Sequence, residues 1–306
     1  MNIGILSRSA ELYSTQSLFR AGKRLGHNMS VIDHTRCSLL LDGNKANVFY
    51  QSKPLHYLDA VIPRIGASVT ALGAAVISQF ELMGVVTPTS PQALQLARDK
   101  LRSLQLLSQK GLPVPKTIMV GRYENLHQIA VKLGGFPVVI KRLEGTHGEG
   151  VALAHNFWEL QRLMSSYFRF HDRVILQEYI PEARGADTRV IVVADQIVAS
   201  MRRQAKPGEF RSNLHLGATS FPINLGAAET EIVREVTRSL GIEVAGVDLL
   251  PSKRGALVME VNASPGLEGI EKTTGADVAG AIVQHVERKF NQEKKVKKSN
   301  KKQKKE

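Results

Sequence analysis

Several features common in other protein classes are missing from this 306-residue chain. A single cysteine, Cys37, excludes an internal disulfide and fits a reducing compartment. No window approaches the roughly 18 apolar residues that a membrane-spanning helix needs, so no membrane contact is expected. The N-terminus, MNIGILSRS, has no long apolar stretch after a basic start, which argues against a secretion signal. These absences predict a cytoplasmic protein.

Two phosphate-binding signatures are also missing. The first predicted strand is not followed by the G-x-G-x-x-G fingerprint of dinucleotide sites. The later glycine-rich stretch, EGTHGEG, is not followed by the Gly-Lys-Ser/Thr of a Walker A loop. A dinucleotide site and a P-loop are therefore not expected.

The net charge of +13 is unevenly spread. The last segment, EKKVKKSNKKQKKE (293–306), contributes +6 and leaves +7 for the rest of the chain. Because this segment is almost free of apolar residues, the chain is expected to be disordered from residue 292 onward. Two readings of the tail stay open, a solubilising extension or a weak contact with RNA or another polyanion. The basic body indicates acidic ligands.

The first 95 residues alternate strand and helix patterns. The short apolar segments NIGILS, MSVID, AVIPR and GVVTPTS are separated by helical stretches near 14–26 and 67–82. Short apolar strands with helical crossovers predict a parallel sheet, so this region is expected to be an α/β domain. Ser90 followed by Pro91 predicts an N-cap that opens a helix running to about Lys110.

The remaining chain is strand-rich. Strand, helix, strand, glycine loop, strand and helix patterns follow one another from about 112 to 175. Two hairpins follow, TRVIVVADQIVASMR, turning at Asp195-Gln196, and VAGVDLLPSKRGALVMEVNASPG. Helices are predicted near 227–241 and 276–290. The fold class is therefore α/β combined with α+β.

The stretch LVMEVNASPGLEGIEKTTG (257–275) predicts a metal site. Glu260 and Asn262 lie two residues apart, so their side chains share one face of a strand. A hairpin loop of three or five residues centred on Arg254 places Asp248 opposite Glu260. With few basic residues expected on that face, three oxygen ligands suit Mg²⁺, which takes its other ligands from water and phosphate. The alternative is a pair of strand-end carboxylates facing solvent or arginine.

Lys141 and a glycine loop predict a phosphate site. Lys141 ends the apolar strand FPVVIKR, directly before EGTHGEG, and the glycines at 145, 148 and 150 can bring backbone N–H groups close to an anion. The alternative is an ordinary turn.

Three further segments fit a nucleotide. The strand VILQEYI ends in Glu178-Tyr179, where an adenine edge could bond to the main chain. Asp187 could accept ribose hydroxyls. Arg203 and the FRSN loop, Arg211 to Asn213, offer guanidinium groups for phosphate. An ordinary core strand and surface arginines are the alternatives.

Together these elements resemble the ATP-grasp fold over residues from about 95 to 290. The segments PRIG, RDKLRS, EGTHGEGV, FRSN and MEVNASPGLEGIEKTTG are similar to those of the RimK-type alpha-L-glutamate ligases, which add glutamate to the C-terminus of a small-subunit ribosomal protein. The resemblance implies an N-terminal α/β domain (1–95), a two-lobed ATP-grasp fold (96–176 and 177–291) and, outside the family pattern, the lysine-rich tail (292–306). One departure is Gly217-Ala218, where the family tends to have two glycines.

The resemblance also implies the roles of individual residues. Two divalent ions per subunit, Mg²⁺ or Mn²⁺, would be shared by Asp248, Glu260 and Asn262, with Glu260 bridging. Arg203 and Lys141 would be catalytic, with Arg203 steadying the γ-phosphate or an acyl phosphate. The implied ATP contacts are Lys141, Glu178, Tyr179, Asp187, Arg211, Ser212 and Asn213, with Lys100 and Gly148 as further candidates.

The reaction implied by the resemblance uses positioned charge. A carboxylate attacks the γ-phosphate of ATP, and the amine of free L-glutamate attacks the resulting acyl phosphate. The absence of a Ser-His-Asp or Cys-His constellation agrees with this chemistry. The expected partners are L-glutamate and the acidic C-terminal tail of a ribosomal protein, and a homo-oligomer, such as a tetramer, is expected.

Two rival functions remain open on the sequence. A ligase with the same nucleotide site could act on a small amino acid, a peptide or a carrier protein. A non-catalytic ATP-binding protein could instead dock on the ribosome or RNA through its tail.

Overall fold

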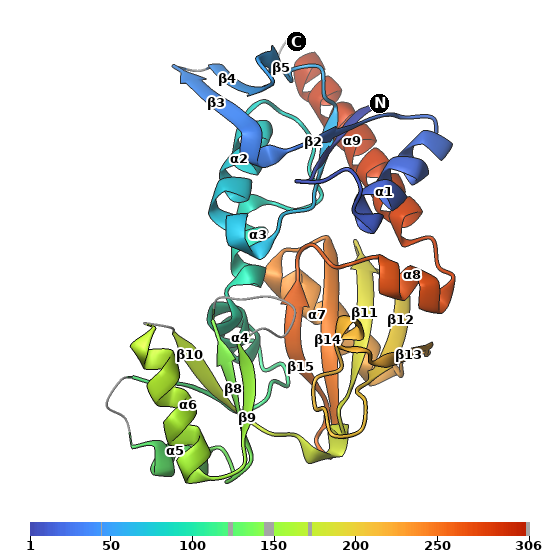
Figure 1. The fold of residues 1–306 in the computed structure, drawn as a ribbon. Helices are drawn as coiled ribbons and strands as arrows, with labels where there is room; N and C mark the ends of the chain where they lie inside the picture. Colours follow the sequence, from blue (N-terminus) through green and yellow to red (C-terminus); the bar gives the residue numbers. More distant parts are fainter. Residues whose placement is uncertain (44, 122–124, 144–149, 171–172, 304–306) are drawn as a thin grey trace.

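The computed structural model describes residues 1–43, 45–121, 125–143, 150–170 and 173–303. Figure 1 shows an N-terminal region above two lobes that stand side by side. The predicted Gly145, His147 and Gly148 of the glycine loop lie outside the described residues.

The N-terminal region contains the predicted parallel sheet. Its strand order is β2-β1-β6, and both pairings are parallel. The fourth predicted strand, GVVTPTS, forms only one bridge, between Val86 and Ala60, because Pro88 follows closely and has no N–H for a ladder. The elements are β1 (Asn2–Leu6), α1 (Tyr13–Arg24), β2 (Asn28–Ile32), β6 (Ala60–Pro63), η2 (Ala67–Val69) and α2 (Thr70–Leu82).

A small antiparallel sheet between β2 and β6 was not predicted. It comprises β3 (Cys37–Asp42), β4 (Lys45–Tyr50) and β5 (Lys53–Pro54), preceded by the short helix η1 (His34–Arg36). Gln79 of α2 fixes this sheet against the helix, because its side-chain amide donates hydrogen bonds to the carbonyls of Leu40 at 2.7 Å and Asn47 at 3.2 Å.

The prediction of a single helix from Pro91 to about Lys110 is wrong. Ser90 does cap its start, accepting from the Ala93 amide at 3.1 Å. The chain then forms two helices, α3 (Pro91–Arg98) and α4 (Lys100–Gln109), because Asp99 leaves the helical conformation and its carboxylate caps α4, accepting from the Arg102 amide at 3.0 Å. The break places Arg98 and Lys100 on either side of a sharp turn.

The first lobe follows the predicted order of elements. Its sheet has the strand order β7-β10-β8-β9, and the buried faces of two helices complete its core. Lys141 is the fourth residue of its central strand β8. The elements are β7 (Thr117–Met119), α5 (Leu126–Lys132), β8 (Val138–Arg142), β9 (Val151–Ala154), α6 (Phe157–Arg169) and β10 (Val174–Glu178).

The second lobe is a five-stranded antiparallel sheet with the order β13-β12-β11-β14-β15. One face, with Val190, Val192 and Val247, packs against α7, so the polar side chains of the strands are left for the opposite face. The elements are η3 (Pro181–Ala183), β11 (Ala186–Val193), β12 (Gln196–Gln204), η4 (Leu214–Leu216), β13 (Thr219–Pro222), α7 (Ala227–Leu240), β14 (Val244–Ser252), β15 (Gly255–Asn262) and α8 (Glu268–Thr274).

Both hairpins of this lobe turn differently from the prediction. The β11–β12 turn lies at Ala194-Asp195, one residue earlier than expected. The β14–β15 loop has two residues, 253–254, rather than three or five, with Gly255 at φ 90°. A two-residue loop alone would place Met259 opposite Asp248. A bulge shifts the register by one residue, so Asp248 faces Glu260 as predicted.

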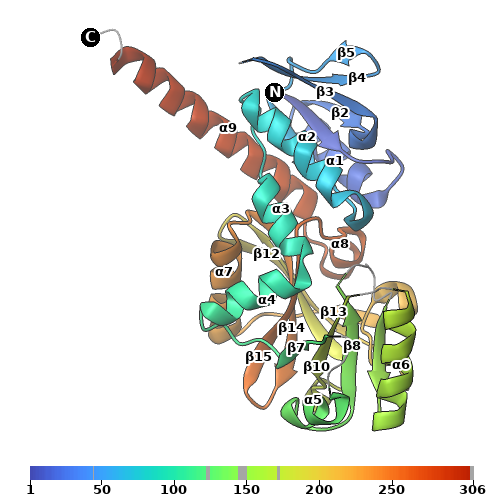
Figure 2. The same cartoon turned by 90° about the vertical axis from the view of Figure 1, so that its left-hand side faces the viewer.

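The last helix, α9 (Val278–Gln303), corrects the expectation of a disordered tail from residue 292. Its first turns are buried against the N-terminal region and the second lobe, as Val278, Ile282 and Val286 show. Packing of these first turns nucleates the helix. Lys, Gln and Glu have high helix propensity, so extending the helix through the following residues is associated with only a small free-energy penalty. Figure 2 shows α9 projecting away from the body. No helix in the described part of the chain could cross a membrane.

Candidate active site

The predicted site residues meet on the polar face of the second-lobe sheet. Asp187 pairs with Arg203 across β11 and β12, and Asp248 pairs with Glu260 across β14 and β15. Arg189 of β11 lies opposite Asp248. Alternate residues on each strand share a face, so one row of carboxylates and guanidinium groups runs across the sheet.

Asp248 is held by two arginines, contrary to the expectation that few basic residues share this face. Arg189 binds it in bidentate fashion, with Nη2 donating to Oδ2 at 2.6 Å and Nε donating to Oδ1. Arg203 Nη2 lies 3.2 Å from the same Oδ2. These contacts occupy about three of the four acceptor positions of a carboxylate, so one position is left for another ligand.

Asp187 and Arg203 form the most buried pair of this network, at 1% and 5% exposure. Arg203 donates from Nε to Oδ1 at 2.7 Å and from Nη2 to Oδ2 at 2.5 Å. Burial opposes the charge of Arg203, but Asp248 and Asp187 together raise its pKa. Burial raises the pKa of Asp187, against the opposing hydrogen bonds from Arg203 and Ser212. Asp187 is therefore satisfied by Arg203 in this structure.

Glu260 and Asn262 differ from Asp248 in having few partners. Among the described residues, Glu260 forms no hydrogen bond or ion pair. The Asn262 Nδ2 atom is buried without a hydrogen-bond partner. The unpartnered Glu260 carboxylate suits an external cation, to which Asn262 could add its Oδ1, whereas the Asn262 Nδ2 donor requires an acceptor such as water or a phosphate oxygen. The donor set of Asp248, Glu260 and Asn262 fits a hard divalent cation such as Mg²⁺.

The described chain has no other obvious metal site. No group of three or more His, Cys, Asp or Glu side chains in the described ranges could hold an ion. The pair of carboxylates with Asn262 is thus the best candidate, and bound water or phosphate oxygens would complete the coordination.

Lys141 faces this row from the first lobe. Burial lowers its pKa to about 8, with the charge of Glu260 opposing the change and that of Lys100 adding to it. Lys100 Nζ donates to the carbonyl of Leu143 at 3.3 Å. Leu143 directly precedes residues 144–149 of the glycine loop, which lie outside the described residues. The Lys141 ammonium therefore lies within the electrostatic reach of Glu260, Asp248 and Asp187, with Lys100 beside it, and forms no ion pair with a described acid.

In the FRSN loop, Arg211 and Ser212 are the residues that interact with acidic side chains. Arg211 forms a bidentate pair with Glu209, at 3.1 Å from Nε and 2.8 Å from Nη2. The hydrogen bond from Arg211 lowers the pKa of Glu209 to about 2. Ser212 is buried and its hydroxyl opposes the rise in the pKa of Asp187, and Asn213 directly precedes η4 without a side-chain cap. A phosphate that binds Arg211 must therefore compete with or displace Glu209.

The predicted adenine strand borders a pocket between the lobes. Tyr179 lines a pocket of about 540 Å³ together with Leu153 of β9 and Phe210 and Arg211 of the second lobe. Its volume lies within the usual range for small-molecule sites. Glu178 accepts from the Lys116 amide at 2.7 Å and pairs with Arg254, so its side chain is engaged and its main chain remains the candidate contact.

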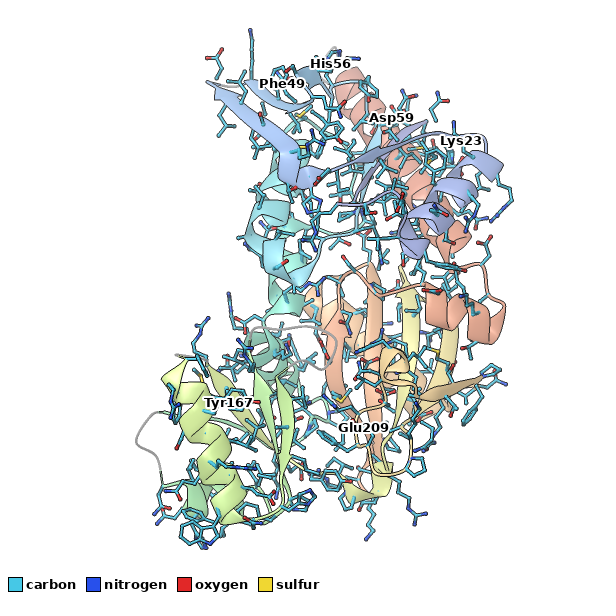
Figure 3. All side chains as sticks on the ribbon, viewed as in Figure 1. Lys23, Phe49, His56, Asp59, Tyr167 and Glu209 are labelled. Carbon is cyan, nitrogen blue, oxygen red and sulfur yellow. The ribbon has the colours of Figure 1, made fainter. Side chains whose placement is uncertain are left out.

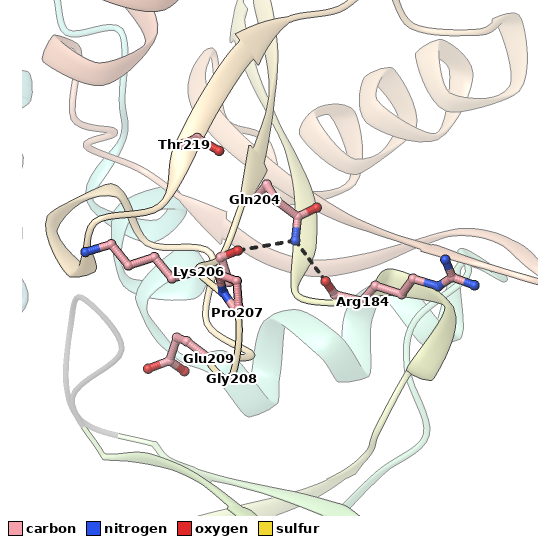
Figure 4. A pocket seen from close by; sticks show the side chains of 8 residues that line it. Arg184, Gln204, Lys206, Pro207, Gly208, Glu209 and Thr219 are labelled. Atoms are coloured by element: carbon pink, nitrogen blue, oxygen red, sulfur yellow. Dashed lines mark hydrogen bonds between the residues drawn. The ribbon is translucent and has the colours of Figure 1, made fainter.

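A second pocket, of about 430 Å³, shares the Gly208–Glu209 rim with the first. Figure 4 shows it with the Gln204 amide donating to the carbonyls of Arg184 and Ala205. Figure 3 labels Glu209 in this part of the second lobe. Residues of the 206–211 loop therefore line both pockets.

Arg189 was missed by the sequence reasoning. It lies two residues after Asp187, so the strand alternation places both on the polar face, and that signal was available. The pairing of Arg189 with Asp248 could not be predicted from the sequence, because strands β11 and β14 are about sixty residues apart.

Comparison with known proteins agrees with this arrangement. Residues 97–286 match the family model of the RimK-like ATP-grasp domain, and residues 1–94 match that of the RimK PreATP-grasp domain. Among solved structures, the ATP-grasp ligase PsnB complexed with a minimal precursor has a TM-score of 0.73 at 20% identity, covering 93% of this chain and 97% of that one. D-alanine–D-alanine ligase from Bacillus anthracis has a TM-score of 0.65 at 17% identity, covering 96% and 99%. The fold is that of the ATP-grasp ligases.

Sequence relatives narrow this class. A probable alpha-L-glutamate ligase of Azotobacter vinelandii is 48% identical over 288 residues, covering 94% of this chain and 96% of the relative. A probable alpha-L-glutamate ligase of Vibrio cholerae has the same identity and coverage. The chain belongs to the RimK family and is an ATP-dependent ligase.

Proposed function

We propose that this protein is an alpha-L-glutamate ligase that joins free L-glutamate to the C-terminal carboxylate of a protein, with a small-subunit ribosomal protein as acceptor. The observation that carries the proposal is the approach of Lys141 to a face where Glu260 and Asn262 lack internal partners beside Asp248. The relatives named as probable alpha-L-glutamate ligases support the choice of amino acid.

The proposed reaction has two steps. An acceptor carboxylate oxygen attacks the γ-phosphorus of ATP, the bond to the β-phosphate oxygen breaks, and ADP leaves. The glutamate amine then attacks the acyl carbon, loses a proton, and expels phosphate together with the former carboxylate oxygen. The products are an amide, ADP and phosphate. Both steps move negative charge, so the protein needs positioned cations more than a nucleophile.

The residues of this chain have distinct tasks in the proposal. Lys141 and Lys100 neutralise phosphate charge from the first lobe, and Arg203 steadies the transferred phosphoryl group from the second. Arg211, Ser212 and Asn213 bind the nucleotide from the loop, while Glu178, Tyr179 and Asp187 hold adenine and ribose. For Asp187 and Arg203 these roles require the buried pair to loosen, because each now satisfies the other.

Asp248, Glu260 and Asn262 would hold two divalent ions, Mg²⁺ or Mn²⁺. When bound, such ions neutralise charge on the β- and γ-phosphates. Asp248 can take part with the acceptor position that its arginines leave open. The glycine loop, with Gly148, would limit access of water to the acyl phosphate.

The proposed function is tested by measuring ADP release with ATP, Mg²⁺ and each free amino acid in turn, with and without an acidic peptide. Mass spectrometry identifies the products. We expect release that depends on glutamate and products lengthened by glutamyl residues. Release that depends on a different amino acid would favour the alternative ligase. Nucleotide binding without turnover would favour the non-catalytic function.

The basic charge of α9 supports a weak contact of its lysine-rich end with RNA. Figure 2 shows the C-terminal part of α9 leaving the body, and Lys294 and Lys295 of this helix are exposed. Removing 293–306 should weaken RNA binding and leave glutamate-dependent turnover unchanged. We also propose a homo-oligomer, such as a tetramer, which sedimentation can test.

A further inference from the structure

Two arginines at the junction of the N-terminal region and the second lobe have no carboxylate partner among the described residues. Arg64 directly follows β6, and its Nη2 donates to the Pro265 carbonyl at 2.6 Å. Arg98 ends α3, and its Nη2 donates to the Ile65 carbonyl at 2.5 Å. Neither forms an ion pair with a described acid. This contrasts with Arg189 and Arg203, which both hold carboxylates.

The surroundings of Arg64 and Arg98 disfavour the charged forms of both side chains. Burial lowers the pKa of Arg64 to about 10, the charge of Arg98 adds to the effect, and Glu271 opposes it from beyond ion-pair distance. Burial also lowers the pKa of Arg98, with Glu260 opposing. A guanidinium group removed from water without a counter-charge is unfavourable, so an anionic ligand would stabilise the pair.

Unpartnered polar atoms lie on the residues around this junction. The buried atoms Arg98 Nε, Asn262 Nδ2 and Ser264 Oγ have no hydrogen-bond partner within the described part of the chain. Asn262 ends β15, against which α3 packs, and Ser264 directly precedes the proline that anchors Arg64. All three atoms can donate a hydrogen bond. A carboxylate only accepts, which matches such a set of donors.

The junction lies at the carboxyl edge of the N-terminal parallel sheet. Arg64 follows β6 and Arg8 follows the neighbouring strand β1. A Cβ atom at Gly66 would lie 3.1 Å from Arg8 Nη2, so a third guanidinium borders the same edge. Open parallel sheets bind ligands outside the carboxyl ends of their strands. Arg98 lies within the electrostatic reach of Glu260, and Arg64 binds the Pro265 carbonyl three residues after Asn262, so a substrate held there would be near the proposed reaction centre.

We propose that Arg64 and Arg98, together with Ser264, form a binding site for a substrate carboxylate. This inference rests on the proposed ligase function and assigns the site that selects an anionic substrate. The carboxylate could belong to the incoming free glutamate or to the acidic acceptor. We infer the incoming glutamate, because the site is built from short, partly buried elements at the junction rather than from an exposed basic surface.

The test uses Arg64→Met, Arg98→Met and the conservative Arg64→Lys, with Arg162→Met on the exposed face of α6 as a matched control. Steady-state kinetics are measured against glutamate, acceptor peptide and ATP separately. We expect the KM for glutamate to rise about 10- to 100-fold in both Met variants, as for loss of a charge-assisted hydrogen bond. The KM for ATP should stay within about twofold, and Arg64→Lys should recover part of the loss.

Folding is checked separately. Arg64 and Arg98 also hold carbonyls, so ADP binding and thermal unfolding of each variant are measured beside the kinetics. Arg64→Lys keeps the inference testable where a Met variant is unstable, since it retains the charge and loses the fork.

The outcomes separate the inference from the proposed function. A wild-type enzyme active with glutamate, combined with unchanged KM values in folded variants, overturns the site and leaves the ligase function standing. A raised KM for the acceptor peptide alone supports the carboxylate site and overturns its assignment to free glutamate. If wild type shows no turnover, calorimetric titration of glutamate into the ADP complex decides. If glutamate binds to wild type and Arg64→Met weakens this binding, the carboxylate site is supported although the ligase function fails. If glutamate does not bind, both the site and the ligase function are overturned.

Discussion

Lys141→Met should stabilise the ligand-free protein while weakening its hold on nucleotide. The pKa of Lys141 falls from 10.5 to about 8 because burial disfavours its charge. At roughly 1.4 kcal/mol per pH unit, the charge of this side chain costs the folded state about 3 kcal/mol at pH 7. Methionine has a similar length and no charge. The net pKa of about 8 already includes the attraction to Glu260, so we expect a gain of up to about 3 kcal/mol in unfolding free energy.

The sign of the pH dependence sharpens this prediction. Below pH 8 the lysine is charged in both the folded and unfolded chains, so its full cost is present. Between pH 8 and 10.5 the unfolded chain binds more protons, and wild-type stability rises relative to the variant. The advantage of Lys141→Met should therefore shrink as pH increases through this window.

The assay is urea denaturation of ligand-free protein followed by circular dichroism at pH 7 and 9.5, with ADP titrations at pH 7. Lys132→Met, at the exposed end of α5, is the matched control and should change stability by less than about 0.5 kcal/mol. ADP affinity should fall at least about tenfold only in Lys141→Met. A variant less stable than wild type at pH 7, or an advantage independent of pH, would refute the reasoning.

Three further predictions concern other residues. Glu260→Gln should lower turnover more than about 100-fold while the circular dichroism spectrum and urea midpoint stay near wild type; substantial ligation by this variant would contradict the metal assignment. Asp187→Asn should cost about 1–3 kcal/mol in urea denaturation because it removes one of the two carboxylates that hold the buried guanidinium of Arg203, the other being Asp248, whereas Asp195→Asn in an exposed turn should be nearly neutral. Burial raises the pKa of Cys37 to about 11, so its labelling by a disulfide reagent at pH 8 should be about 100-fold slower in native protein than in urea; equal rates would show that the thiol is not shielded.

The strands of the site were readable from the sequence because alternation is local. Glu260 and Asn262 share a face whatever the strand pairs with. Their position opposite Asp248 was predicted through a longer loop, and the structure reaches it through a shorter loop and a bulge. Bulges depend on cross-strand packing, which a single strand does not encode.

Other features were not readable for different reasons. The break at Asp99 competes with a helical pattern that continues on both sides, although aspartate is a good N-cap. The ordered start of α9 depends on distant apolar partners in the N-terminal region. The arginines that hold Asp248 lie on strands that are far from Asp248 in the sequence. The balance of charge on this face could therefore be seen only from the three-dimensional pairing of the strands.

Isotope transfer tests the central claim most directly. Wild-type protein is incubated with ATP, Mg²⁺, an acidic acceptor peptide and glutamate, with the carboxylate oxygens of both peptide and glutamate labelled with ¹⁸O, and the released phosphate is analysed by mass spectrometry. An acyl phosphate passes one carboxylate oxygen to phosphate for each bond formed, so the account predicts one ¹⁸O per phosphate in step with glutamyl products. Phosphate that carries no ¹⁸O while glutamyl products accumulate would contradict it.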